Sequence, residues 1–194
     1  MIGSREDLVE YLAADRSALG RKRKKPALND YIWKYEILLR KCEYRQNTKC
    51  GFFDRMALLW LKMRRSKLGV LCGFEIPLNT IGKGLSLAHM GPVIISEYAR
   101  IGENCRIHSG VNIGADARKN DAAPQIGNNV YIGPGAKLYG AITVANDIAV
   151  GANAVVNHSF TDPGVSIGGI PAKVISNTGT DGILINRRDH QKEE

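Results

Sequence analysis

A six-residue repeat runs through residues 81–175 and constrains the fold more than any other feature of the sequence. An aliphatic residue recurs every six positions, and a second small or apolar residue follows most of these by four positions. Such repeats are typical of a stacked parallel β-solenoid, in which three hexads form one three-sided coil of about 18 residues. We therefore expect a mainly β fold with these side chains inside. The recurring aliphatics are Ile81, Leu87, Val93, Ile101, Ile107, Ile113, Ile126, Ile132, Leu138, Val144, Val150 and Val156, and their followers are Leu85, Cys105, Val111, Val130, Ala136, Ile142, Ile148 and Ala154.

Two irregularities interrupt this period. Two extra residues fall between Val93 and Ile101, and a longer polar insertion, Ala115–Gln125, separates Ile113 from Ile126. The insertion is too polar to stay inside the prism, so we expect it to leave as a loop. Insertions in solenoids tend to lie on the functional face.

Three helices are expected before the solenoid, at residues 4–18, 28–45 and 52–68. Ser4 is the expected N-cap of the first helix and Asn29 or Asp30 that of the second, because short polar side chains accept hydrogen bonds from free backbone N–H groups. Gly69 is expected to end the third helix.

The third expected helix has an apolar face formed by Phe53, Ala57, Trp60 and Leu61, with basic residues opposite. A basic amphipathic helix can lie on a membrane surface. We favour a different interpretation, in which this face packs on the first coil of the solenoid or on a neighbouring subunit.

These features divide the chain into a helical segment at 1–69, a β-helix domain at 70–175 and a tail at 176–194. The tail is polar apart from the short apolar run at 183–185, so we expect it to be mobile.

The net charge of +8 is concentrated in the helical segment. Residues 1–70 carry 17 Lys and Arg against 8 Asp and Glu, and the run GRKRKKP at 20–26 is the most basic stretch. Such a run can bind nucleic acid. We interpret it as a solvated connector and expect no nucleic-acid partner.

The four cysteines, Cys42, Cys50, Cys72 and Cys105, fit no zinc-site spacing and suggest no disulfide framework. A reducing compartment is then the default, so we expect a cytoplasmic protein. The N-terminus lacks the apolar core of a signal peptide, and no run is long enough to cross a membrane, so we expect no stable membrane insertion.

His89 is the strongest candidate for chemistry. It occupies an outward position among small or turn-forming residues, Ala88, Gly91 and Pro92, which leave room for a ligand. Imidazole titrates near neutrality, as a general base for a hydroxyl requires, although a plain surface histidine is the alternative. Glu75, fourteen residues earlier in the sequence, is the candidate partner that would orient it, and an ordinary surface carboxylate is the alternative.

His108 begins the equivalent hexad of the next coil and is expected to stack beneath Ala88 and to line the same pocket. His89 and His108 together raise the possibility of a metal site. A third ligand at suitable spacing is missing, because His190 lies in the tail and His158 lies far along the solenoid unless another subunit supplies it, so we expect no metal.

The stretch GGIPAKVI at 168–175 is expected to close the solenoid. A Gly-Gly-x-Pro turn lets a ligand approach the backbone closely, and Lys173 offers a positive charge for a phosphate. The same turn could also serve only to end the prism.

The hexads, the loop, the run IGNNVYIGPGAKLYGAITVANDIAVGANAVV and the ending GIPAKVI resemble the hexapeptide-repeat acyltransferase superfamily, and most of all serine O-acetyltransferase. The resemblance covers roughly residues 52–175. It implies a left-handed parallel β-helix and a homotrimer with active sites between neighbouring prisms, and the trimers could pair into a dimer of trimers.

The same resemblance implies acetyl-CoA as the co-substrate, lying along the prism edge. The positions that match its binding residues are Gly114, Ala115, Pro134, Ala152 and Lys173. His89 matches the catalytic base of the family, which would deprotonate the acceptor hydroxyl for direct attack on the thioester.

The chain departs from the family pattern where the acceptor binds. Ala88 replaces the usual Asp before the catalytic histidine, Ala122 and Ala123 replace Arg-His before the loop proline, and Glu75-Ile76-Pro77 replaces the usual Asp-Ile-His-Pro. Arg118 or Lys119 could supply the missing cation.

Three functions follow in order of preference. The first is transfer of acetyl to L-serine in cysteine biosynthesis, with a small-molecule acceptor bound near His89, His108 and Arg118. The second is acetylation of a sugar hydroxyl in surface polysaccharide assembly. The third, of another class, is a non-catalytic trimeric scaffold.

Overall fold

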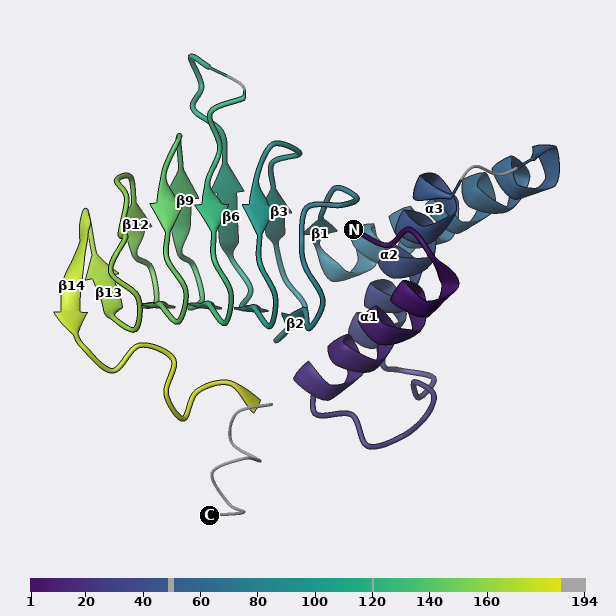
Figure 1. The fold of residues 1–194 in the computed structure, drawn as a ribbon, viewed down its shortest axis with the longest axis horizontal. Coiled ribbons are helices and arrows are strands. Elements are labelled where there is room, and N and C mark those ends of the chain that lie inside the picture. Colours follow the sequence, from purple (N-terminus) through teal and green to yellow (C-terminus); the bar gives the residue numbers. More distant parts are fainter. Residues whose placement is uncertain (49–50, 120, 186–194) are drawn as a thin grey trace.

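The computed structural model describes residues 1–48, 51–119 and 121–185, and it divides into a helical part and a strand-rich prism (Figure 1). The helices are α1 (Arg5–Ala18), α2 (Tyr31–Asn47) and α3 (Phe52–Cys72). The strands are β1 (Phe74–Glu75), β2 (Ser86–Leu87), β3 (Val93–Ile95), β4 (Arg100–Ile101), β5 (Arg106–Ile107), β6 (Val111–Gly114), β7 (Gln125–Ile126), β8 (Tyr131–Ile132), β9 (Lys137–Tyr139), β10 (Thr143–Val144), β11 (Ala149–Val150), β12 (Val155–Val156), β13 (Ser166–Gly169) and β14 (Ala172–Ser176).

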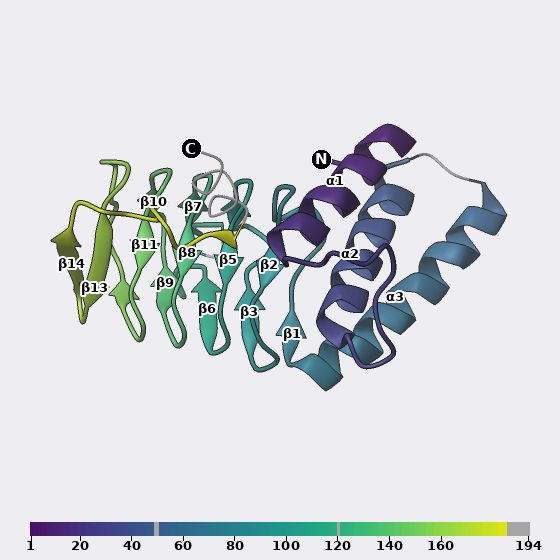
Figure 2. The same cartoon turned by 90° about the horizontal axis from the view of Figure 1, so that it is seen from below.

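The strands form three sheets that the chain visits in turn. Sheet A has the order β1-β3-β6-β9-β12, sheet B the order β10-β7-β4, and sheet C the order β14-β13-β11-β8-β5-β2. All strand pairs are parallel except β13 and β14. Successive coils therefore stack in register along one axis, as Figures 1 and 2 show.

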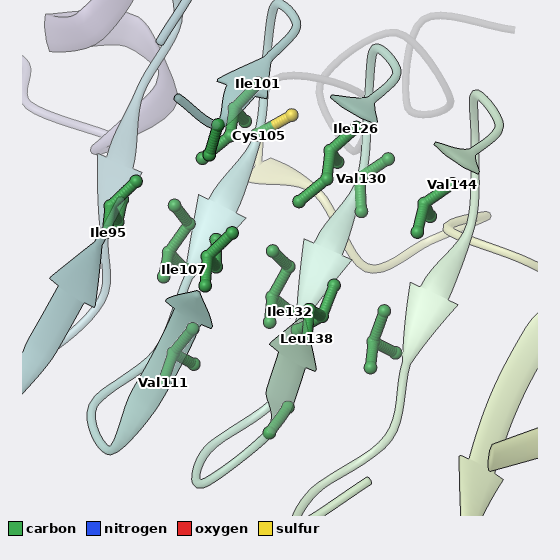
Figure 3. Close-up of a cluster of buried hydrophobic side chains, with 14 of the residues drawn as sticks. Ile95, Ile101, Cys105, Ile107, Val111, Ile126, Val130, Ile132, Leu138 and Val144 are labelled. Atoms are coloured by element: carbon green, nitrogen blue, oxygen red, sulfur yellow. The ribbon is translucent and has the colours of Figure 1, made fainter. Parts of the chain in front are cut away.

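The repeat residues fill the interior, as the hexad pattern predicts. Every recurring aliphatic and every follower is buried, and Ile107, Ile132, Leu138 and Val150 have no exposed surface. Figure 3 shows their side chains stacked in rows along the prism axis. The packing is tight at the corners: a Cβ on Gly102 would lie 2.6 Å from the carbonyl oxygen of Gly127, so only glycine fits there.

The register corrects the position of the short insertion. Val93 pairs with Val111 and Ile95 with Ile113, while Leu87 pairs with Ile107. The two extra residues therefore lie between Leu87 and Val93, and not between Val93 and Ile101 as the repeat suggested. They enlarge the corner that carries His89.

The longer insertion leaves the prism as expected. It follows β6 and forms the projecting hairpin at the top of Figure 1. Within this loop, Asp116 and Lys119 form an isolated antiparallel β-bridge. The N–H of Asp116 also donates to the carbonyl oxygen of Ala122. Ala123 is buried where the loop returns to β7.

The N-caps of α1 and α2 are the residues expected from the sequence, but the third helix ends later than expected. Ser4 caps α1 in a capping box with Asp7, and Asp30 caps α2. The third helix continues past Gly69 to Cys72 and ends at Gly73, which has φ 80°. Gly69 has another role: a Cβ there would lie 2.8 Å from the carbonyl oxygen of Phe74, so glycine lets the helix approach β1.

A buried charged network joins the helices to the open first coil. Arg40 of α2 has no exposed surface, and its guanidinium donates to the carbonyl oxygens of Ile81 at 2.9 Å and Gly82 at 2.6 Å. Asp15 of α1 and Glu43 of α2 balance its charge, with Nε 2.7 Å from the Asp15 carboxylate and Nη1 3.0 Å from that of Glu43.

The carboxylates of the helices also satisfy the free N–H groups of that coil. Asp15 accepts from the N–H groups of Gly84 and Leu85, both at 2.8 Å, and Glu36 accepts from that of Leu87 at 2.9 Å. The end of a solenoid exposes unpaired backbone groups that would otherwise pair with another chain. The helices therefore act as a cap, with Arg40 and three acidic side chains in place of a further coil.

Within one chain, the apolar face expected on the third helix is only partly covered, and its packing on a neighbouring subunit stays a prediction. Phe53 is 86% and Trp60 52% exposed, whereas Ala57 and Leu61 are half-buried, and α3 packs on α2. The exposed residues form an apolar face on α3, which Ser66 and Lys67 interrupt: Phe52, Phe53, Met56, Leu59, Trp60, Met63, Val70 and Leu71. Among the described residues, no helix is long and apolar enough to cross a membrane.

The C-terminal segment corrects the expectation of a mobile tail as far as residue 185. After the β13–β14 hairpin closes the prism, residues 177–185 run back along it toward α1 (Figure 2). Thr180 and Leu184 are 1% and 2% exposed, and the N–H of Thr180 donates to the carbonyl oxygen of Asp147 at 3.2 Å. We call residues 177–185 the strap; the rest of the expected tail, with His190, lies outside the described residues.

Candidate active site

His89 lies exposed on the enlarged corner between sheets C and A, which we call the His89 edge. The corner is held by the end of α3 on one side and by the next coil on the other. The N–H of Gly91 donates to the carbonyl oxygen of Cys72 at 2.8 Å, and the N–H of Gly110 donates to that of Pro92 at 2.6 Å. Gly91 has φ 133°, which side-chain-bearing residues rarely adopt. The backbone of this corner is thus fixed while the imidazole of His89 faces solvent.

His108 stacks beneath Ala88, as expected, and its ring meets that of His89. The two ring centroids are 5.5 Å apart in an edge-to-face arrangement. The next coil adds Tyr131, whose ring centroid lies 5.1 Å from that of His108. Three rings therefore follow one another down the His89 edge, one from each of three consecutive coils.

The environment of His108 keeps its imidazole neutral. Partial burial, followed by the charge of Arg106 and the proximity of His89, lowers the pKa of His108 below its ordinary value. Its Nε2 is buried and has no hydrogen-bond partner among the described residues. A neutral imidazole can donate or accept one hydrogen bond at that atom, but the surface does not expose it, so His108 forms part of the wall beside His89.

Glu75 lies on β1, opposite Ile94 of β3, and its side chain is exposed. It borders a groove of about 520 Å³ between α3 and sheet A, which also includes Pro77 and Pro92. No hydrogen bond joins Glu75 to His89 within the described part of the chain. The structure thus places Glu75 one coil from the His89 corner without bringing the two side chains together.

Pro134 and Ala152 lie on the same edge as His89, at the corners of the following coils. Both are exposed, and the N–H of Asn153 donates to the carbonyl oxygen of Pro134 at 2.8 Å. Lys173 lies further along, on β14 opposite Gly168, with its side chain exposed. Small residues followed by a terminal lysine leave this edge open to an extended ligand that ends in an anion.

Gly114, Ala115 and Arg118 lie elsewhere, at the opposite end of β6. We call that corner the loop edge. Gly114 comes five positions after Ser109 on the His89 edge, or roughly 16 Å away at the rise of a β-strand. Arg118 is exposed on the loop, and its N–H donates to the Asp116 carboxylate at 2.8 Å. One chain therefore does not bring these residues to His89.

The other histidine of the prism, His158, is also distant from His89. It lies beyond β12, past the far end of sheet A, where its ring packs on Phe160 with centroids 4.6 Å apart. The described residues contain no group of three or more His, Cys, Asp or Glu that could hold a metal ion.

Sequence reasoning missed Tyr131 as a member of this site. The available signal was its outward position directly before the buried Ile132, in register with Arg106 of the coil before. Arg106 itself donates to the hydroxyl of Ser86 at 2.8 Å, which fixes a cation next to the ring stack.

Known proteins resemble this chain in both sequence and fold. Serine acetyltransferase from Helicobacter pylori is 39% identical over 100 residues, which are 50% of this chain and 58% of that protein. Soybean serine acetyltransferase has a TM-score of 0.68 at 27% identity, covering 88% of this chain and 69% of its own. Serine acetyltransferase from Brucella abortus in complex with coenzyme A has a TM-score of 0.64 at 23% identity, covering 90% and 68%.

No family model matches the chain. The chain also spans only about half the length of the curated relatives that it matches, between 50% and 58% for the first of them. It is thus similar to serine acetyltransferases in sequence over part of its length and in fold over most of it.

Proposed function

We propose that the protein is an acetyl-CoA-dependent O-acetyltransferase of serine acetyltransferase type, which acetylates the hydroxyl of L-serine in cysteine biosynthesis. The observation that carries this proposal is the exposed His89, held on a fixed, enlarged corner beside the neutral His108. A prism that resembles serine acetyltransferases in fold and sequence gives this corner its context.

In the proposed reaction, His89 takes the proton from the acceptor hydroxyl as the oxygen attacks the thioester carbonyl carbon. The tetrahedral intermediate then collapses with loss of the CoA thiolate, and the proton held by His89 passes to the sulfur. His108 would line the acceptor pocket, because its ring lies against that of His89. Holding both substrates in one cleft would contribute much of the rate.

Acetyl-CoA would lie along the His89 edge, past Pro134 and Ala152, with a phosphate near Lys173. The similarity to a serine acetyltransferase solved with coenzyme A supports this placement. Pro134 and Ala152 expose little side chain that could block a thin pantetheine arm, and Lys173 is exposed and forms no ion pair within the described residues.

Assembly is part of the proposal, because one chain holds only part of the site. In a homotrimer of left-handed prisms, the loop edge of one copy would face the His89 edge of the next, adding Gly114, Ala115 and Arg118. The exposed apolar face of α3 supports further association, including a dimer of trimers. Glu75 would orient His89 once the cleft is filled. A cytoplasmic location agrees with the free cysteines of the described chain.

A sugar acceptor is the second candidate, and two observations favour it. Alanines at 88, 122 and 123 stand where serine acetyltransferases usually carry the residues that bind the amino acid. The ring of Tyr131 beside His108 offers a stacking surface of the kind that suits a sugar ring.

Release of free CoA thiol distinguishes these functions. Purified protein with acetyl-CoA is offered L-serine, D-serine, threonine and a panel of sugars, and thiol release is followed with a colorimetric reagent. We expect turnover with L-serine well above the rate without acceptor. Turnover with a sugar and not with L-serine would support the sugar acetyltransferase instead. No turnover with any acceptor would favour the non-catalytic trimeric scaffold.

A further inference from the structure

A second concave site lies in the helical cap, apart from the His89 edge. It is a groove of about 680 Å³ formed by the connector at residues 24–26, by α2 and by α3. This volume falls within the range of pockets that bind small molecules. The groove shares no lining residue with the acetyl-transfer site proposed above.

The rim of the groove is strongly cationic. It carries Lys24, Lys25, Lys34, Lys41, Arg64 and Lys67, and its lining contains no acidic residue. None of the six forms an ion pair within the described part of the chain. Charges of one sign that converge from three chain segments repel one another, and an anion bound between them would relieve that repulsion.

Two of the cations are already held in place. The ammonium group of Lys34 donates to the carbonyl oxygen of Leu28 at 2.5 Å and lies 5.7 Å from the ring centroid of Tyr31. The guanidinium of Arg64 lies 4.6 Å over the ring of Trp60. Ordering these side chains in advance lowers the entropy that a ligand must remove when it binds.

The floor of the groove is apolar. Leu38 is buried, Ile37 and Leu68 are half-buried, and Pro26 and Tyr31 complete the wall. A bare inorganic anion would leave the apolar floor exposed to water, whereas an aromatic or apolar group would bury it. The groove thus matches a ligand with several negative charges at one end and a flat or apolar body at the other.

We infer that this groove binds a small soluble ligand that carries two or more phosphoryl groups on an aromatic body, with the chemistry of a nucleoside triphosphate. The phosphoryl groups would lie among Lys34, Arg64 and Lys67, and the aromatic body would lie against Tyr31 and the apolar floor. Neither nucleic acid nor a membrane surface fits as well, because the cations surround an apolar floor from three chain segments and do not form a long stripe.

Calorimetric titration of the full chain with adenosine triphosphate at 150 mM salt tests the inference. We expect saturable binding of about one ligand per chain, and binding of inorganic triphosphate at least tenfold weaker because it lacks the aromatic body. The triple variant Lys34→Gln, Arg64→Gln and Lys67→Gln should bind adenosine triphosphate about 100-fold more weakly or worse, since each charge-assisted contact contributes about tenfold or more.

A second triple variant, Arg5→Gln, Arg23→Gln and Arg55→Gln, removes the same charge from exposed positions outside the groove lining. It should keep the affinity within about twofold. Circular dichroism and thermal melting show whether each variant is folded. If the groove triple variant does not fold, the single variant Lys67→Gln, at an exposed position, is titrated in its place.

Several results would overturn the inference. No binding at millimolar nucleotide would do so, as would an equal loss of affinity in both triple variants, which indicates diffuse attraction. Binding confined to anionic phosphatidylglycerol vesicles or to a single-stranded oligonucleotide would assign the groove to a membrane or to nucleic acid instead.

Discussion

Arg40 illustrates at the residue scale how a charged side chain can replace secondary structure. It lies fully buried between the helices and the first coil, and its donors are shared between two carboxylates and two backbone carbonyls. Helical periodicity places position 40 on the same side of α2 as Trp33 and Glu36, but nothing in the local sequence distinguishes it from a solvated arginine. The sequence therefore did not predict this network.

Replacing Arg40 by Met should lower the free energy of unfolding by about 3–5 kcal/mol, because Asp15 and Glu43 would be left buried without their cation. Urea denaturation at one fixed protein concentration measures this. The exposed Arg5→Met variant is the control and should change stability by less than about 0.5 kcal/mol. Equal small effects in both variants would show that the network contributes little.

Glu36 gives the cap a dependence on pH. Burial, and next the nearby charge of Asp15, raise the pKa of Glu36 well above its ordinary value, and one of its carboxylate oxygens has no partner among the described residues. The folded chain then holds a proton that the unfolded chain loses above about pH 4.5. This contribution to stability is present at low pH and falls as pH rises from there toward the folded pKa.

Glu36→Gln should remove the fall in stability at rising pH. The amide oxygen can still accept from the N–H of Leu87, and the side chain carries no charge at any pH. Between pH 5 and pH 8, the variant should lose less stability than the parent in urea denaturation. At pH 8 it should be at least as stable as the parent. A variant with the parent's pH dependence would show that Glu36 is ionised throughout.

At the scale of elements, the sequence identified all three helices and the solenoid, because their apolar patterns repeat over many residues. It failed at their boundaries. A glycine near the end of a helix usually terminates it, yet Gly69 lies inside α3 and Gly73 ends it. The short insertion was misplaced for a similar reason: Val93 and Ile95 are both aliphatic, so the repeat alone could not tell which one occupies the hexad position.

Gly69→Ala distinguishes a packing glycine from a terminating one. Alanine favours a helix by about 1 kcal/mol in a free helical position. Here its Cβ would meet the carbonyl oxygen of Phe74, so we expect a net loss of about 1–3 kcal/mol in the free energy of unfolding. Ser66→Ala, at an exposed position of the same helix, should be neutral or slightly stabilising. A stabilising Gly69→Ala would contradict the close approach of α3 to β1.

At the scale of the whole molecule, the solenoid is held at both ends: the helices cap its first coil and the hairpin β13–β14 closes its last. The strap connects these ends, and Ile185 lies against Gly20 near the end of α1, where its side chain would be 3.4 Å from an added Cβ. The polar composition of residues 176–182 concealed this, because their backbone and not their side chains makes much of the contact.

Leu184→Ala tests whether the strap stabilises the fold. Loss of a buried leucine side chain costs about 2–5 kcal/mol in a core. The strap can detach locally, so we expect a smaller loss of about 1–2 kcal/mol, with faster amide exchange at Thr180. The exposed Val174→Ala variant is the control. Unchanged exchange at Thr180 would show that the strap does not depend on Leu184.

The sequence also predicted much of the candidate site: the outward His89, the position of His108 beneath Ala88, and the loop. The sequence could not show that the loop edge and the His89 edge lie apart within a single chain. That separation depends on where the chain turns between the sheets of the prism. Nor could the sequence identify Tyr131, since an outward aromatic on a strand has many roles.

His89→Ala tests the central claim most directly. Acetyl transfer from acetyl-CoA to the acceptor that the panel identifies is measured by thiol release, and CoA binding by calorimetry. The turnover rate should fall by about 10²–10⁴-fold, the usual contribution of a general base, while CoA affinity stays within about twofold. His158→Ala, an exposed histidine at another corner, should keep the parent rate. Full turnover by the His89→Ala variant would contradict the assignment of His89 as the base.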